Sequence, residues 1–125
     1  MKLILIVEDN EKNLKLVRDV LRFKGYRTIE ATTAAEGLRL AREELPTLVL
    51  MDIQLPDFDG ITALAKLRAD ALTRSIPVVA VSASVMPDDQ QRIRASGFDA
   101  YITKPIDVKG FVGTVERIIG KPAEG

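Results

Sequence analysis

The sequence predicts an α/β fold: one domain in which a parallel sheet is covered by helices on both faces. Three observations support this fold class. Apolar runs without alternation occupy residues 3–7, 48–51 and 78–81, as is typical of strands buried on both faces. Segments with helical periodicity separate these runs, and the connections are short. Right-handed crossovers between parallel strands would then place helices on both sides of a doubly wound sheet.

The first strand and the first helix have the clearest signals. Residues 3–7 form an uninterrupted aliphatic run. Leu14, Val17 and Leu21 then recur at helical spacing. Gly25 is expected to end this helix, because glycine readily adopts the left-handed conformation of a helix C-terminus.

In the second strand–helix pair, the sequence signal for the strand is weak and the signal for the helix is stronger. Residues 27–31 are a short strand candidate. Thr33 is a suitable N-cap for a helix that ends near Pro46. The residues that we expect on the inner side of this helix are Ala35, Leu38 and Ala41.

The third pair follows the apolar run at 48–51. Its helix is predicted from about Ile61 through Leu64 and Leu67. Polar and small residues precede the helix and are typical of a turn leading into it. They are Asp57, Asp59 and Gly60.

The fourth helix, predicted from about Pro87 to Ser96, is short and polar. After Met86 its single large apolar residue is Ile93, and Gly97 stands at its natural end. Only a narrow stripe of this helix can face a core. We therefore expect it to be weakly anchored and able to move.

The last strand candidate, residues 99–103, precedes a well-anchored helix at about 107–119. Apolar residues recur through this helix at spacings of three and four. They are Val108, Phe111, Val112, Val115 and Ile119.

Composition excludes several classes of function. The 125 residues contain no cysteine and no histidine, which excludes disulfides, thiolate zinc sites and Ser-His or Cys-His hydrolase chemistry. The 18 basic and 18 acidic residues balance, so bulk charge gives no reason to expect nucleic acid or an acidic membrane as partner. No apolar stretch is long enough to span a bilayer and no secretory leader is evident, so a cytoplasmic location is expected.

Charged or hydroxyl side chains lie at the ends of four of the predicted strands. Glu8 and Asp9 follow the first strand, Asp52 ends the third, Ser82 follows the fourth, and Lys104 follows the fifth. Ligands of open α/β sheets bind beyond the carboxyl ends of the strands, where all these side chains should meet. Three carboxylates at one edge would raise each other's pKa unless a cation neutralises them. The sequence therefore predicts a site for a divalent cation and a phosphoryl group.

Each of these residues also has a structural interpretation. Glu8 and Asp9 can simply lie at the start of the first helix, where the helix dipole favours negative charge. Asp52 can cap the loop that begins at the next residue. Lys104 can be a solvated surface lysine and Ser82 an ordinary loop residue. The trans form is the default for the Lys104–Pro105 bond, although a cis turn is possible there. The agreement of the separate positions favours the site.

The chain resembles the receiver domain of two-component response regulators. The resemblance covers nearly all of the chain, and five separated positions match in order. The segments that carry it are VEDN at 7–10, LVLMDIQLPDFDG at 48–60, PVVAVSAS at 77–84 and YITKPI at 101–106. The sequences of these segments are most similar to those of stand-alone regulators of the DivK type. The resemblance implies a flavodoxin-like sheet of strand order 2-1-3-4-5.

The resemblance also implies a role for each residue at the site. Asp52 would accept a phosphoryl group from a kinase phosphohistidine. Asp9, Asp52 and the backbone carbonyl of Gln54 would bind Mg²⁺ directly, and Glu8 would act through water. These ligands suit an ion that prefers octahedral oxygen coordination.

Three further residues would respond to the phosphoryl group. Lys104 would contact one phosphoryl oxygen and the Ser82 hydroxyl another. Movement of Ser82 would then let Tyr101 turn inward and remodel the surface of the fourth helix, fifth strand and fifth helix. Alternatively, Tyr101 is a half-buried sheet residue in both states. Gln54 and Ser84 lie where side chains can admit or exclude the hydrolytic water.

Output is expected to run through a protein partner. We assign residues 1–120 to the receiver domain and 121–125 to a short tail, with no output domain. The partners would be a histidine kinase or phosphotransfer protein and a downstream effector, and the protein would be a monomer or a weak homodimer. Asn10, Asn13 and Leu14 are the first candidates for the kinase contact, although a capped helix with Leu14 in the core fits equally well.

Two alternatives belong to other functional classes. A small Mg²⁺-dependent phosphatase would place a second aspartate two residues after the nucleophile, where this chain has Gln54. A non-phosphorylated binding scaffold would be expected to lack Asp9, Asp52 or Lys104, and all three are present. A P-loop nucleotide switch fails because its motif is missing. The favoured prediction is a phosphoacceptor switch that is not an enzyme acting on a separate substrate.

Overall fold

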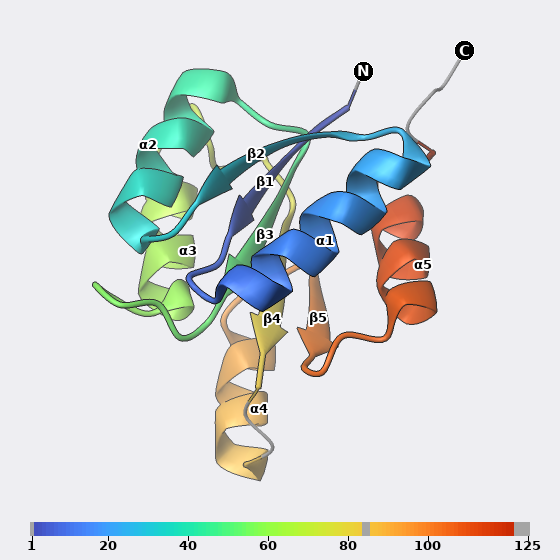
Figure 1. Cartoon of the computed structure of the whole chain (residues 1–125). Helices are drawn as coiled ribbons and strands as arrows, with labels where there is room; N and C mark the ends of the chain where they lie inside the picture. The colour runs from blue at the N-terminus through green and yellow to red at the C-terminus, as the bar shows by residue number, and fades with distance from the viewer. Residues whose placement is uncertain (1, 84–85, 122–125) are drawn as a thin grey trace.

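The computed structural model describes residues 2–83 and 86–121, so that Ser84 and most of the tail lie outside the described part. Strands and helices alternate along the chain (Figure 1). In chain order the elements are β1 (Leu3–Val7), α1 (Glu11–Lys24), β2 (Arg27–Ala31), α2 (Ala34–Glu44), β3 (Leu48–Asp52), α3 (Gly60–Ala69), β4 (Val78–Ser82), α4 (Pro87–Ala95), β5 (Ala100–Thr103) and α5 (Val108–Ile119).

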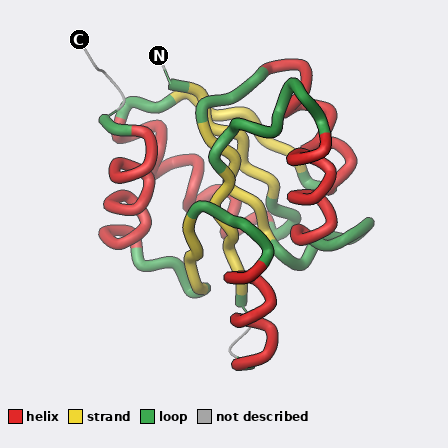
Figure 2. Tube along the Cα trace, turned by 180° about the vertical axis from the view of Figure 1, so that it is seen from behind, coloured by secondary structure: helices red, strands yellow, loops and turns green. Residues whose placement is uncertain are grey.

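The five strands form one parallel sheet of order β2-β1-β3-β4-β5. Helices α1 and α5 lie on one face, and α2 and α3 lie on the other (Figures 1 and 2). This confirms the predicted doubly wound fold and strand order. The connections from β1 and β3 run to opposite sides, so the crevice for a ligand is expected at the carboxyl ends of these two strands.

The central strands alternate their side chains between two cores. Ile4 and Ile6 of β1 pack with α1 and α5, whereas Leu5 and Val7 pack with α2 and α3. Because both faces are buried, nearly every position must be apolar. This explains the uninterrupted runs in the sequence and fixes the register that places the polar residues at the strand ends.

The helix ends follow the predicted signals. Gly25 ends α1 in the left-handed conformation, with φ of 104°, and the Thr33 side chain accepts a hydrogen bond from the Glu36 amide at the start of α2. The inner faces of α2 and α5 differ from the prediction at two positions. Ala35 is exposed and Val108 is 41 % exposed. Both lie in the first turn of a helix, where solvent reaches more of the circumference.

Helix α4 is attached to the core by one buried side chain. Ile93 is only 1 % exposed and packs with Ile53 and Ala80, whereas Met86 before the helix is 61 % exposed. The helix has no side-chain cap at its N-terminus. These features confirm the predicted weak anchoring of α4.

None of the described helices is long and apolar enough to cross a membrane.

Candidate functional site

The register of the sheet brings the predicted polar residues together. Val7 pairs with Met51, so Glu8 and Asp52 follow at neighbouring strand ends. Ser82 pairs with Thr103, and the Lys104 amide donates to the Ser82 carbonyl oxygen at 2.8 Å. Backbone hydrogen bonding alone therefore carries Lys104 to the edge where the carboxylates lie.

Lys104 lies between two buried carboxylates. Its Nζ atom is 2.8 Å from Glu8 Oε1 and 3.1 Å from Asp52 Oδ2. Burial lowers the Lys104 pKa, but the hydrogen bond that its ammonium donates to Glu8 and the charges of both acids outweigh burial and raise the pKa overall. The ammonium group is therefore held charged at the site. The surface interpretation of Lys104 is wrong, and the Lys104–Pro105 peptide bond is cis rather than trans.

Asp52 has an unfavourable environment for a charged carboxylate. Burial, the largest cause, and the neighbouring Glu8 raise its pKa, which comes to about 6 overall. Lys104 and the Gln54 amide, which donates to Asp52 Oδ1 at 3.1 Å, act in the opposite direction but do not cancel the rise. A cation bound beside Asp52 at this edge of the sheet would therefore favour the ionised form of its carboxyl group.

Glu8, Asp9 and Asp52 form a group suited to a metal ion. One carboxylate oxygen from each lies within 4.8 Å of the other two. Among the residues that the structure describes, no other cluster of acidic, histidine or cysteine side chains meets this condition. Asp9 is exposed, whereas Glu8 and Asp52 are each 4 % exposed, so the group opens to solvent on one side.

The acidic group lines a surface hollow of about 460 Å³. The other lining residues are Asn10, Asn13, Gln54, Ala83 and Lys104. The hollow therefore presents hard oxygen ligands and one fixed ammonium group. Such a set can hold a divalent cation beside a doubly charged phosphoryl group.

Ser82 and Tyr101 lie on the strands next to the site. Ser82 is 1 % exposed at the end of β4. Tyr101 on β5 is half-buried, and its hydroxyl is enclosed without a hydrogen-bond partner in the described part of the chain. The Arg94 guanidinium of α4 lies 5.7 Å from the centre of the Tyr101 ring. Tyr101 thus contacts the weakly anchored helix directly.

The predicted kinase contact is corrected at one residue. Asn10 is the N-cap of α1 and accepts a hydrogen bond from the Asn13 amide at 3.0 Å. Leu14 is 8 % exposed and belongs to the core. The core interpretation of Leu14 is therefore confirmed, and only the two asparagines border the hollow.

The loop after β3 contains a residue whose position the sequence did not reveal. Asp59 caps α3, as a turn residue should, by accepting from the Thr62 amide at 2.8 Å. Asp57 instead reaches the N-terminus of α2, where Ala34 and Ala35 donate to its two carboxylate oxygens at 2.8 Å each. Asp57 does lie in a bend before α3, as predicted, but the sequence did not predict that its side chain would bond to α2. A local pattern cannot reveal a partner more than twenty residues away.

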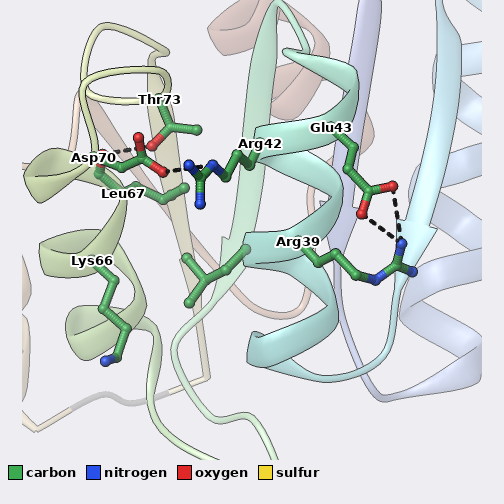
Figure 3. A pocket seen from close by; sticks show the side chains of 8 residues that line it. Arg39, Arg42, Glu43, Lys66, Leu67, Asp70 and Thr73 are labelled. Atoms are coloured by element: carbon green, nitrogen blue, oxygen red, sulfur yellow. Dashed lines mark hydrogen bonds and ion pairs between the residues drawn. The ribbon is translucent and has the colours of Figure 1, made fainter.

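A second hollow, between α2 and α3, differs chemically from the first (Figure 3). Its arginines are paired, Arg39 with Glu43 at 3.0 Å and Arg42 with Asp70 at 3.5 Å. Lys66 of α3, on the opposite wall from these arginines, lies 5.8 Å from the centre of the Phe58 ring. Since these cations already have partners, this hollow is not the candidate site.

The geometry of the first hollow agrees with comparisons to known proteins. Residues 4–116 match the model of the response regulator receiver domain family. The chain belongs to this family. Among its relatives, the polar-differentiation response regulator DivK of Brucella ovis is 48 % identical over 119 residues, which cover 95 % of this chain and 97 % of that protein.

Solved receiver structures have the same fold. The receiver domain of sensor histidine kinase PA1611 from Pseudomonas aeruginosa PAO1, which has a magnesium ion coordinated in its active-site cleft, superposes with a TM-score of 0.88 at 30 % identity. The superposition covers 96 % of this chain and 98 % of that domain. The Mn²⁺-bound form of response regulator Rcp1 gives a TM-score of 0.78 at 28 % identity and covers 94 % and 91 % of the two chains.

Proposed function

We propose that this receiver domain is a phosphorelay switch in which Asp52 accepts a phosphoryl group in a Mg²⁺-dependent reaction. The observation that carries the proposal is the enclosure of Asp52 between Glu8, Asp9 and Lys104 at the carboxyl ends of the strands. A carboxylate oxygen of Asp52 would bond to phosphorus while the bond from phosphorus to the donor nitrogen breaks. The released imidazole of the donor histidine keeps the electron pair and takes up a proton.

The chain's own residues fit the metal that this chemistry needs. Asp9 and Asp52 would supply carboxylate oxygens, the Gln54 carbonyl a third oxygen, and Glu8 would act through water. When bound, Mg²⁺ supplies positive charge that neutralises the equatorial oxygens of the transferring group. Lys104 would contact another of these oxygens, and the Ser82 hydroxyl would donate to a third. Every charged oxygen then has a partner.

Intact mass measurement tests the assignment of Asp52. The parent protein and Asp52→Asn are incubated with a small phosphodonor and MgCl₂. We expect one phosphoryl adduct on the parent and none on the variant, because asparagine has no nucleophilic carboxylate. An adduct on both proteins, or on neither, would reject Asp52 as the acceptor.

The proposed output runs through α4 and Tyr101. A phosphoryl group adds charge and three acceptor oxygens, which can draw Ser82 and its loop inward. Tyr101, whose enclosed hydroxyl lacks a partner in the described chain, can then change position together with α4. The surface of α4, β5 and α5 would thereby be switched between two states of different affinity for a partner.

Amide hydrogen exchange tests this output. With a beryllium fluoride adduct at Asp52 we expect protection to change within residues 87–101, because Ile93 alone anchors α4 in the core. The sheet core, residues 3–7 and 48–51, is the internal control and should exchange equally slowly in both states. Equal protection of 87–101 with and without the adduct would leave α4 and Tyr101 without a role in output.

The partners follow from family membership in general terms only. Receiver domains of two-component systems imply a histidine kinase or phosphotransfer protein as donor and an effector protein as target. In this proposal the protein promotes its own phosphorylation and dephosphorylation and has no separate substrate. The scaffold alternative is less favoured because the acceptor, the acidic metal-binding group and the lysine are assembled together.

A further inference from the structure

Asp57 connects the loop that follows Asp52 to the N-terminus of α2. Its Oδ1 accepts from the Ala34 amide and its Oδ2 from the Ala35 amide, each at 2.8 Å. Burial raises the pKa of the Asp57 carboxyl, but these bonds, together with the backbone amides of Phe58 and Asp57, hold it below its usual range. Both carboxylate oxygens are thus engaged by one helix N-terminus, which favours negative charge.

The same loop is closed at its base. The Gly60 amide donates to the Ile53 carbonyl at 2.8 Å. A Cβ atom at Gly60 would lie 2.6 Å from the Asp52 carbonyl oxygen, so only glycine permits this approach. With its base closed at Gly60 and its far part bonded to α2 through Asp57, the loop that contains Gln54 is fixed at two points.

Helix α2 is in turn fixed against β1. A Cβ atom at Gly37 would lie 2.7 Å from Val7 Cγ2, so the helix rests directly on the residue that precedes Glu8. The position of α2 is therefore set by the strand that carries Glu8 and Asp9. Through α2, Asp57 connects this strand to the loop that follows Asp52.

We propose that Asp57 is a positioning residue for the divalent cation, because its two bonds to α2 set the place of the Gln54 carbonyl relative to Asp9 and Asp52. The inference rests on the proposed function, in which that carbonyl is a metal ligand. The groups that orient metal ligands affect affinity strongly, and their loss typically costs tenfold or more.

Asp57 is not the only side chain that caps α2. Thr33 already caps this helix through the Glu36 amide at 3.1 Å. The Ala35 amide belongs to an exposed residue and can bond to water when the carboxylate is removed, whereas Ala34 is fully buried. Removal of Asp57 therefore affects the start of α2 as well as the loop, and a control at the same helix end is needed to separate the two effects.

Calorimetric titration of the full chain with MgCl₂ tests the proposal. We expect Asp57→Ala to raise the Mg²⁺ dissociation constant roughly tenfold, and Asp57→Asn to raise it less, because asparagine retains one acceptor oxygen. In phosphorylation by a small phosphodonor, Asp57→Ala should raise the Mg²⁺ concentration for half-maximal rate and leave the rate at saturating Mg²⁺ nearly unchanged. Circular dichroism confirms that each variant is folded, and Asp57→Asn carries the test if Asp57→Ala does not fold.

Thr33→Ala is the matched control, since it removes a hydrogen bond from the same helix end without touching the loop. Its Mg²⁺ affinity should equal that of the parent. Unchanged affinity in both Asp57 variants, or an equal loss in Thr33→Ala, overturns the positioning role. If the parent itself binds no Mg²⁺, the metal site of the proposed function fails, and this inference fails with it.

Discussion

Asparagine at position 52 should stabilise the metal-free protein at neutral pH, although it removes the proposed phosphoacceptor. Burial and the neighbouring Glu8 raise the pKa of Asp52 to about 6, from an ordinary value of 3.8. A carboxyl group that ionises less readily in the folded state lowers the free energy of unfolding once it is charged. With a discount for solvent screening, we expect Asp52→Asn to raise this free energy by about 1–2 kcal/mol at pH 7.5, measured by urea denaturation.

The neutral side chain keeps most local contacts. Its Oδ1 atom can still accept from the Gln54 amide, and Lys104 retains its ion pair with Glu8 at 2.8 Å. The substitution therefore removes a buried charge without leaving a cation unpaired. This is the reason to expect a gain in stability at a position that function requires to be acidic.

The gain should appear only in a defined pH range. Below pH 3.8 Asp52 is protonated in both the folded and unfolded states, so its raised pKa carries no penalty there. Between pH 3.8 and about 6 the unfolded chain releases this proton while the folded protein keeps it, so the relative stability of the parent falls across that range, and the penalty is complete once the folded carboxyl is also ionised. The difference between variant and parent should be near zero around pH 4 and reach a plateau above pH 7, by roughly one unit beyond the folded pKa.

Asp59→Asn serves as the control of opposite sign. The hydrogen bond from the Thr62 amide holds the pKa of Asp59 below its usual range, so its charge stabilises the fold above that pKa. Loss of this charge should slightly lower the free energy of unfolding at pH 7.5. A pH-independent difference for Asp52→Asn, or a loss of stability at pH 7.5, would contradict the account of a strained carboxylate.

The sequence predicts most of this fold because its strands are buried on both faces. The runs at 3–7, 48–51 and 78–81 are typical of parallel strands, and in such a sheet the polar residues after them lie at one edge. The convergence of the acids with Lys104 therefore follows from topology. The strand order came from the family resemblance, since periodicity does not determine which strands are neighbours.

Other features depend on contacts between distant segments. Asp57 lies in a sequence that is typical of a turn, yet it bonds to α2 more than twenty residues earlier. The cis form of the Lys104–Pro105 bond is likewise set by tertiary context, whereas local preference favours trans. Leu14 could be placed in the core only after the phase of α1 against the sheet was known.

Lys104→Met should strongly destabilise the metal-free protein at pH 7.5. The ammonium group is the cation between Glu8 and Asp52, whose side chains are each 5 % exposed. Methionine of similar length leaves two buried carboxylates without a counter-charge, and breaking such a pair typically costs several kcal/mol. Because Asp52 can take up a proton and relieve part of the repulsion, we expect a loss of about 2–3 kcal/mol in urea denaturation.

A double-mutant cycle separates this effect from lost packing. If the cost arises from repulsion between Glu8 and Asp52, Lys104→Met should destabilise Asp52→Asn much less than it destabilises the parent. Mg²⁺ should also raise the stability of Lys104→Met more than that of the parent, since added positive charge replaces the missing ammonium. Lys15→Met, which breaks an exposed pair with Asp19, is the control and should change little. An equal cost of Lys104→Met in both backgrounds would mean that its alkyl chain, and not its charge, supports the site.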